Sequence, residues 1–244
     1  MTDKELEQER IKKSSHRKYL IAGVVILLLI TLALVLFVFI QTRRPDPESE
    51  KIIREAAAAQ LGKDPNSLTD EDFAKITELS IGDRTQTILA MYDDGDWLKY
   101  AYNKLADIKL LRKFTNLQTL YLGSIDVPAD KIPKWMLLLS KLGIFDLEKR
   151  FSFDLSPLEK LSHLEKLQVG GNAVNNIQPL AKLGNLKNLQ LINATVSDLK
   201  PLESQKQLEK LYIIFCPKLK YKDLEDLGKA IPNLKITSTI NKPR

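Results

Sequence analysis

The chain has 244 residues, of which 44% are hydrophobic and 28% are charged, and its formal net charge is +6. Its length suits one large domain or two small ones, and its composition is that of a folded protein. Residues 1–44 hold eight Lys and Arg against four Asp and Glu, which leaves 29 against 27 for the rest. Because the main part is nearly neutral, a surface for nucleic-acid phosphates is not expected.

A basic tail, residues 1–18, precedes a long apolar segment. The 21 residues from Leu20 to Ile40 carry no charge, and Thr31 is their only hydroxyl residue. As a helix with a rise of about 1.5 Å per residue, this segment reaches roughly 30 Å, which is enough to span the hydrocarbon of a bilayer. The sequence therefore predicts one transmembrane helix over residues 19–41.

Two other interpretations fit the apolar segment less well. A buried core helix keeps polar positions and rarely runs this far. A cleaved signal peptide has a shorter apolar core followed by a small-x-small site, which residues 37–42 lack. Six Lys or Arg precede the segment and four follow it closely, which favours an amino terminus in the cytoplasm. We expect a single-pass signal anchor, with a short linker at 42–47 and an extracytoplasmic remainder.

Apolar residues recur every 22 residues in the carboxyl-terminal half of the chain. Five columns keep this step over three windows: Leu155, Ile177, Leu199; Leu158, Leu180, Leu202; Leu164, Leu186, Leu208; Leu167, Leu189, Leu211; and Val169, Leu191, Ile213. Each window reads L-x-x-L-x-L-x-x-N/C. The L-x-L pair predicts a short parallel strand with both side chains inward, and only stacked windows can bury that face.

This pattern resembles the leucine-rich-repeat family, and the Pro179-Leu180 and Pro201-Leu202 steps resemble its bacterial, internalin-type subclass. The middle window departs from the pattern, because Ala194 stands where the Asn of the ladder belongs. The resemblance implies an α/β solenoid over residues 77–240, a horseshoe with a parallel sheet on its concave face. Because the predicted transmembrane helix precedes the solenoid, we expect a membrane protein of the bacterial envelope.

The segment at 48–76 resembles the helical amino-terminal cap of such solenoids. An Ala-rich helix is expected to end at Gly62, and Thr69 with Asp72 forms a capping-box pattern that opens a second short helix. Further repeats outside the three windows give seven strands in all, with the added strands at Leu79 and Ile81, Leu120 and Leu122, Phe145 and Leu147 after Leu139 and Leu142, and Leu234 and Ile236.

An insertion is predicted at about 84–106, because Ile81 and Leu122 are 41 residues apart where 22 would suffice. Insertions in solenoids emerge on one face, which is often the binding face. Three aromatic residues are candidates for contact with a partner: Trp97, Tyr100 and Tyr102. The alternative is that Trp97 and Tyr100 pack an inserted helix onto the solenoid.

The sequence shows no motif for catalysis, for a metal or for a cofactor. His16 and His163 have no plausible nucleophile or metal ligand, and Cys216 is the only cysteine. We interpret Cys216 as a structural rung of the repeat rather than a reactive thiol. The acidic residues at 93–96 lack the closing Glu of a calcium loop, so they are interpreted as a solvated turn.

The concave face remains the main candidate for binding. Its outward side chains, which flank the inward leucines, are Tyr121, Asp146, Glu148, Lys166, Gln168, Gln190, Lys210 and Tyr212. Their mixture of aromatic, amide and oppositely charged groups suits a protein or another cell-surface component better than a nucleic acid, although an ordinary soluble surface has a similar mixture. We expect a non-enzymatic binding protein; the alternative is a structural or assembly subunit of a membrane complex.

Overall fold

The computed structural model describes residues 25, 46–81, 88–91, 97–100, 102–103, 105–125, 141–142 and 152–242. The chain divides into two compact units, residues 1–45 and 46–244. Apart from Val25, the predicted tail and transmembrane segment lie outside the described residues. Among the residues that the structure does describe, no helix is both long enough and apolar enough to cross a bilayer.

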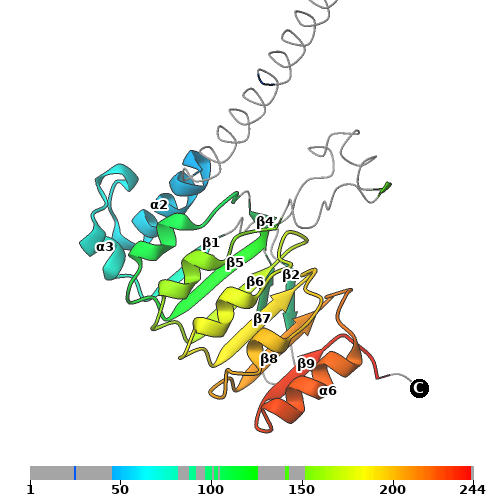
Figure 1. Cartoon of the computed structure of the whole chain (residues 1–244). Helices are drawn as coiled ribbons and strands as arrows, with labels where there is room; N and C mark the ends of the chain where they lie inside the picture. The colour runs from blue at the N-terminus through cyan, green and yellow to red at the C-terminus, as the bar shows by residue number, and fades with distance from the viewer. Residues whose placement is uncertain are drawn as a thin grey trace, which may run out of the picture. The chain divides into compact units, whose positions relative to one another are not determined.

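The second unit begins with two α-helices, as the sequence predicts (Figure 1). Helix α2 (Pro47–Leu61) starts at Asp46, whose carboxylate accepts the Ser49 N–H, and ends at Gly62 with φ 63°. A 3-10 turn, η1 (Pro65–Ser67), leads to α3 (Asp70–Ala74). The left-handed backbone at Gly62 is the usual stop signal of a helix, so the predicted end of α2 is confirmed.

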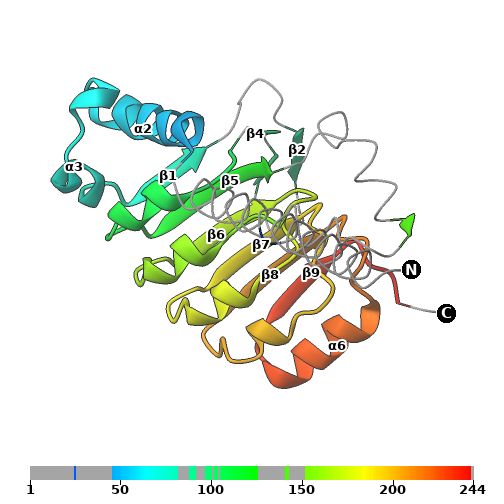
Figure 2. The same ribbon diagram turned by 45° about the horizontal axis from the view of Figure 1, so that its top comes forward.

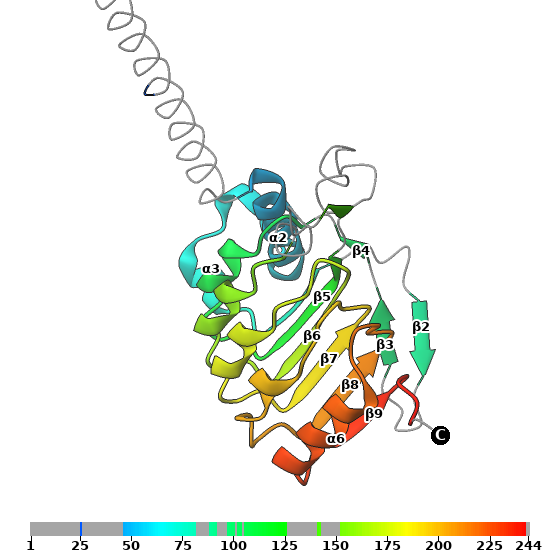
Figure 3. The ribbon, with the colours of Figure 1, turned by 45° about the vertical axis from the view of Figure 1, so that its right-hand side comes forward.

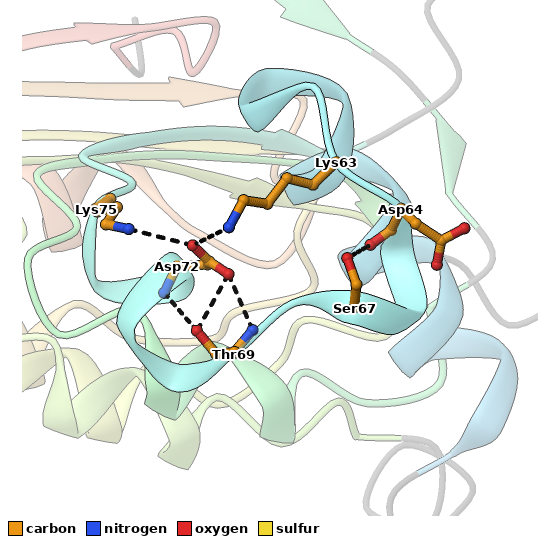
Figure 4. Close-up of polar contacts among 6 residues, drawn as sticks. All are labelled: Lys63, Asp64, Ser67, Thr69, Asp72 and Lys75. Carbon is orange, nitrogen blue, oxygen red and sulfur yellow. Dashed lines mark hydrogen bonds and ion pairs between the residues drawn. The ribbon is translucent and has the colours of Figure 1, made fainter.

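The predicted capping box at the start of α3 is present (Figure 4). The Thr69 hydroxyl accepts the Asp72 N–H at 3.3 Å, and the Asp72 carboxylate accepts the Thr69 N–H at 3.1 Å. Lys63 and Lys75 donate to the other carboxylate oxygen at 2.7 Å and 3.3 Å. Asp72 is buried, so the three donors to its carboxylate replace the water that a buried carboxylate has lost.

Helices α2 and α3 pack against the first rung of the sheet. Helix α2 contacts the first strand, and it buries Ile53, Ala57 and Ala58. The ring of Phe73 on α3 lies 4.9 Å from the ring of Phe114, which belongs to the first repeat. The helices therefore shield apolar side chains at one end of the stack from water.

Six parallel strands form the main sheet in the order β1-β5-β6-β7-β8-β9. Their bounds are β1 (Glu78–Ile81), β5 (Thr119–Ile125), β6 (Lys166–Gly170), β7 (Asn188–Ile192), β8 (Lys210–Ile214) and β9 (Lys235–Ser238). A short strand, β4 (Tyr102–Asn103), pairs with the end of β5. Lys166 pairs with Asn188, and Asn188 pairs with Lys210. Neighbouring strands are therefore 22 residues apart in the sequence, which is also the spacing of the leucines.

Short 3-10 helices cover one face of the sheet (Figure 2). They are η3 (Lys109–Lys113), η5 (Ser156–Lys160), η6 (Gln178–Lys182) and η7 (Lys200–Leu202), and the last repeat has α6 (Tyr221–Ala230) instead. Each of these 3-10 helices is preceded by an Asp or Asn whose side-chain oxygen accepts the backbone N–H two residues later. These residues are Asp107, Asp154, Asn176 and Asp198. This local turn chemistry returns the chain to the next strand at the same place each time.

The core lies between these helices and the sheet. All five leucine columns of the three windows are buried in it, as are Leu79, Ile81, Leu120 and Leu122. Each fully buried Leu or Ile contributes about 1.5–3 kcal/mol relative to an exposed one, so the stacked repeats supply most of the stabilisation. The second unit is therefore a solenoid of leucine-rich repeats, with the sheet on one side.

The chain leaves β6, β7 and β8 through a left-handed residue. Gly171 has φ 103°, and Asn193 and Phe215, one and two repeats later, have φ 52° and 53°. The Cys216 thiol then lies in the core and donates to the Leu191 carbonyl at 3.5 Å, which confirms its structural role. Asn172, which occupies the same column as Cys216 two repeats earlier, is exposed, and Ala173 takes the buried position.

One strand that the sequence predicts, at residues 145–147, is wrong. Strand β5 pairs directly with β6, Thr119 opposite Lys166, so no strand from residues 145–147 lies between them. Leu142, which was assigned to the core of that repeat, is 63% exposed. The residues between β5 and β6 therefore contribute no strand between these two, and they constitute a second insertion that the spacing of the leucines concealed.

Candidate functional site

The face of the sheet away from the 3-10 helices is here named the open face, and it corresponds to the predicted concave face. Alternate residues of a strand point to it, because successive side chains point to opposite sides. The parallel register arranges them in two rows: Thr119, Lys166, Asn188, Lys210 and Lys235, then Tyr121, Gln168, Gln190, Tyr212 and Thr237. Six of the predicted binding residues belong to these rows.

A shallow hollow of about 240 Å³ lies on the open face where β5 to β8 begin. Four predicted binding residues line it: Tyr121, Lys166, Gln190 and Lys210. Its other lining residues are Glu165, Leu167, Lys187, Asn188 and Glu209. Because most of these residues belong to strands held by a parallel hydrogen-bond ladder, their backbone positions are fixed before any ligand arrives.

Two amide side chains in the hollow have an unused acceptor. The side-chain oxygens Oδ1 of Asn188 and Oε1 of Gln190 are buried and receive no hydrogen bond from the described residues. An acceptor in this state costs free energy of about 1–3 kcal/mol. Both residues line the hollow, so this cost is concentrated at the candidate site.

The charges of the hollow are of both signs. Lys187 forms an ion pair with Glu165, with Nζ 3.1 Å from Oε2. Lys166 and Lys210 stand on either side of Asn188 in the first row, and Glu209 lies at the rim. Among its lining residues there is no Ser, Cys or His. The described hollow can therefore form hydrogen bonds and ion pairs, but it lacks the usual nucleophile and base of acyl transfer.

The part of the open face nearer the strand ends is covered, which the sequence did not indicate. Gln168 and Tyr212 are only 3% and 2% exposed, so the expectation that they present a free surface is wrong. Ile192 and Ile214 point the same way and are also buried, although they lie outside the main core. The accessible part of the open face is therefore its polar half at the strand starts.

The insertion provides an element on that side of the sheet. Strands β2 (Ile88–Met91) and β3 (Trp97–Tyr100) form an antiparallel hairpin, and β3 contacts β5. Figure 3 shows both strands on the side of the sheet away from the 3-10 helices. Ile81 pairs with Leu122, so these two residues occupy equivalent positions in neighbouring strands. The inserted helix considered for Trp97 and Tyr100 is wrong, since both belong to β3.

Several predicted binding residues stay untested. Only the backbone of Trp97, Tyr100 and Tyr102 is described, so the choice between packing and recognition for these aromatic side chains remains open to experiment. Asp146 and Glu148 lie outside the described residues. In the part of the chain that is described, no group of three His, Cys, Asp or Glu side chains could hold a metal ion.

Sequence reasoning missed four polar residues of the hollow. Asn188 occupies the same column as Lys166 and Lys210, and the preceding column contains Glu165, Lys187 and Glu209. Both columns keep the 22-residue spacing, so an alignment of the outward-facing positions of the three windows would have identified these four residues.

The sequence matches no family model, and no curated protein is similar enough to it in sequence to match. Solved structures do match. An internalin from Listeria monocytogenes is 17% identical with a TM-score of 0.30, covering 82% of this chain and 61% of its own. Internalin C2 from the same organism is 21% identical with a TM-score of 0.32, covering 81% of this chain and 98% of its own.

A leucine-rich-repeat protein of Leptospira interrogans is 22% identical with a TM-score of 0.36, and the match covers 57% of this chain and 36% of that protein. The chain thus spans less than two thirds of the length of the first of these three proteins. The fold assignment rests on the strand register and the buried leucine columns, and the matches add no functional argument to it.

Proposed function

We propose that this chain is a membrane-tethered recognition protein, which binds another protein through the open face of its solenoid and carries out no catalysis. The observation that supports this most directly is the hollow. It combines in-register side chains, charges of both signs and two buried acceptors without donors. The backbone of such a surface is rigid before binding, so little backbone entropy is lost when a partner docks.

The polar character of the hollow supports a reversible binder over a permanently docked assembly subunit. A subunit that is always covered by its partner has a mostly apolar contact surface, which would be exposed after isolation. Here the apolar residues of the open face, Ile192 and Ile214, are already buried within the chain. What stays accessible is mostly polar, with lysines, amides and Tyr121, as in interfaces that form and separate.

The tether belongs to the same proposal. The uncharged segment Leu20–Ile40 would anchor the chain, with residues 1–18 in the cytoplasm and the solenoid on the far side, in a bacterial envelope. In sealed inverted vesicles, protease should remove the tail and leave the solenoid intact. Digestion of the solenoid with protection of the tail would mean the opposite orientation, and release of the full chain by alkaline carbonate would exclude the anchor.

Photo-crosslinking in native membranes tests the recognition proposal. A photo-reactive amino acid replaces Lys166 or Gln190 in the hollow, and in a matched control it replaces Lys200, which is exposed on the helical face. We expect both hollow positions to capture the same protein and the Lys200 position to capture none of it. Capture from Lys200 alone would place recognition on the other face and overturn the proposal.

A further inference from the structure

The two edges of the main sheet differ in what covers them. At the first edge, α2 contacts β1 and buries Ile53, Ala57 and Ala58. At the last edge, β9 pairs with β8 and with no other strand of the described residues. Figure 1 shows β9 at the end of the sheet, with α6 on its helical side. An edge strand in this state offers backbone N–H and C=O groups to another strand.

The hydrogen bonds of β9 show which of its backbone groups point outward. Lys235 and Thr239 donate their N–H groups to carbonyls of the chain at β8, at 2.9 Å and 3.1 Å. Because alternate residues of a strand bond to the same neighbour, Thr237 also faces β8. Ile236 and Ser238 therefore direct their N–H and C=O groups to the uncovered side.

Local hydrogen bonds limit this outward edge at both ends. The N–H of Leu234 donates to the Ile231 carbonyl at 3.1 Å, and the N–H of Ile240 donates to the Ser238 hydroxyl at 2.9 Å. The outward N–H groups that remain for another strand are therefore those of Ile236 and Ser238. The edge is short, so a matching strand must present its own outward groups at the same two positions.

Apolar side chains at the same edge are incompletely buried. Leu234, Ile236 and Ile240 pack against the core but remain partly exposed. In contrast, Leu211, which pairs with Ile236 from β8, is fully buried. A further strand beside β9 would remove more of this apolar surface from water, which is favourable.

We propose that β9 pairs antiparallel with β9 of a second copy of this chain, about a two-fold axis at Thr237. In this register Ile236 of each copy lies opposite Ser238 of the other, so the outward backbone groups of both residues are bonded. Lys235 lies opposite Thr239 of the second copy, so the two lysines do not face each other. This interface uses none of the residues that line the hollow, and it does not depend on the proposed recognition of a partner.

Other registers and other strands match the edge less well. An axis at Ile236 would place Ser238 opposite Leu234, whose N–H is already bonded. An axis at Lys235 would bring two lysines together, which is unfavourable. A strand of another protein would have to supply its own apolar residues, whereas a second copy supplies the same partly exposed leucine and isoleucines.

Introduced disulfides test the pairing in the purified full chain in detergent. Cys216, the only cysteine, is buried, so an introduced thiol is the accessible one. Residues opposite each other at the axis have Cα atoms about 4.5 Å apart, which permits a disulfide. With oxidised glutathione, Thr237→Cys should form a covalent dimer at least about 10-fold faster than Lys235→Cys, whose two copies would lie about 13 Å apart along the strands. Both native side chains are exposed, so Lys235→Cys is a matched control.

A mixture of two variants tests the antiparallel register. Lys235→Cys and Thr239→Cys should each form little covalent dimer alone, because neither residue lies opposite its own copy. The mixture should form the mixed dimer, since these two positions lie opposite each other in the proposed register.

Sedimentation of the full chain over a range of concentrations provides a readout without crosslinking. The parent should form reversible dimers, and Thr237→Lys should raise their dissociation constant about 5-fold, because two like charges meet at the axis. Gln178→Lys, at an exposed position on the helical face, adds the same charge and should have little effect. Circular dichroism checks that each variant keeps its fold.

Three results would overturn the inference: a parent that is monomeric at all concentrations, a Thr237→Cys dimer that forms no faster than the Lys235→Cys dimer, or an unchanged dissociation constant in Thr237→Lys. The last result would assign any dimer to another surface. If Thr237→Cys in native membranes forms a disulfide with a different protein and none with itself, the edge pairs with a strand of that protein and the second copy is wrong.

Discussion

The Ser49 hydroxyl accepts the backbone N–H of Ala106 at 2.8 Å, which joins the first turn of α2 to a segment 57 residues away. The same oxygen accepts the Asp107 N–H at 3.2 Å and donates to the Asp46 carboxylate at 2.7 Å. Ser49 is fully buried, so water cannot replace these contacts. One serine thus fixes the start of the folded unit to the chain that leaves the insertion.

Ser49→Ala should lower the free energy of unfolding by about 1–3 kcal/mol, because two partly buried N–H groups lose their acceptor. Urea unfolding followed by circular dichroism measures the change. Ser67→Ala is the matched control, since the Ser67 hydroxyl is exposed and bonds only to the Asp64 carbonyl. Equal losses in the two variants would show that the link from α2 to Ala106 adds nothing.

Asp72 should make the folded unit sensitive to acid. The hydrogen bond from Lys63, followed by those from Thr69 and Lys75, holds the pKa of its carboxyl well below the ordinary range. A depressed carboxyl pKa stabilises the fold above the pKa of the unfolded chain, about 3.9, and this stabilisation is lost as the pH falls through the folded pKa. Asp72→Asn should therefore have a lower free energy of unfolding than the parent at pH 7, and this difference should become smaller below about pH 4. A difference in free energy of unfolding that is the same at pH 7 and pH 3 would contradict this.

Gly171→Ala should destabilise the solenoid by about 2 kcal/mol or more. Its φ of 103° is unsuited to a side chain, and a Cβ there would collide with the backbone of Ile125 on the neighbouring strand. Gly184→Ala is the control, since nothing lies within 4 Å of the added carbon. We expect this second change to be neutral or slightly stabilising in thermal unfolding. A similar loss in both would mean that the turn after β6 tolerates a side chain.

The Cys216 thiol should be unreactive in the native protein. Burial raises its pKa, which lowers the fraction of reactive thiolate at a given pH. At pH 8, labelling by a thiol reagent should be at least about 10-fold slower in buffer than in urea. A Lys200→Cys variant in a Cys216→Ser background supplies the exposed thiol for comparison. Equal rates for the two thiols would place Cys216 outside the core.

The strands that the sequence predicts correctly are those whose positions are fixed by more than one column. Around β6, β7 and β8, five apolar columns and the Asp154, Asn176 and Asp198 turns repeat together. The columns and the turn residues fix the same strand register, because a shift by one residue would expose the leucines.

The strand that was wrongly predicted at 145–147 was supported only by the spacing of its apolar residues. A step of 22 before Asp154 reaches Ile132, and a step of 22 after Asp107 reaches Ala129, so neither position offers the side-chain acceptor that opens a 3-10 helix in the other repeats. Leucines alone do not distinguish a repeat from an insertion. The turn residue does, because it sets where the chain returns to the sheet.

For the candidate site, the sequence predicted which residues share a face but not which of them stay accessible. Gln168 and Tyr212 stand in the same row as Gln190, yet both are buried. Their burial depends on what covers the open face near the strand ends, and the position of an inserted segment is set by tertiary packing rather than by any local pattern. The strand register itself, and thus the lysine row, follows from the repeat.

The most direct test of the central claim is lysine acetylation footprinting of the full chain, in native membranes and after purification. Lys166 and Lys200 are both exposed, on the open face and on the helical face respectively. If the open face recognises a partner, Lys166 should be protected in membranes and reactive after purification, whereas Lys200 should react equally in both. Protection of Lys200 with Lys166 reactive throughout would contradict recognition through the hollow.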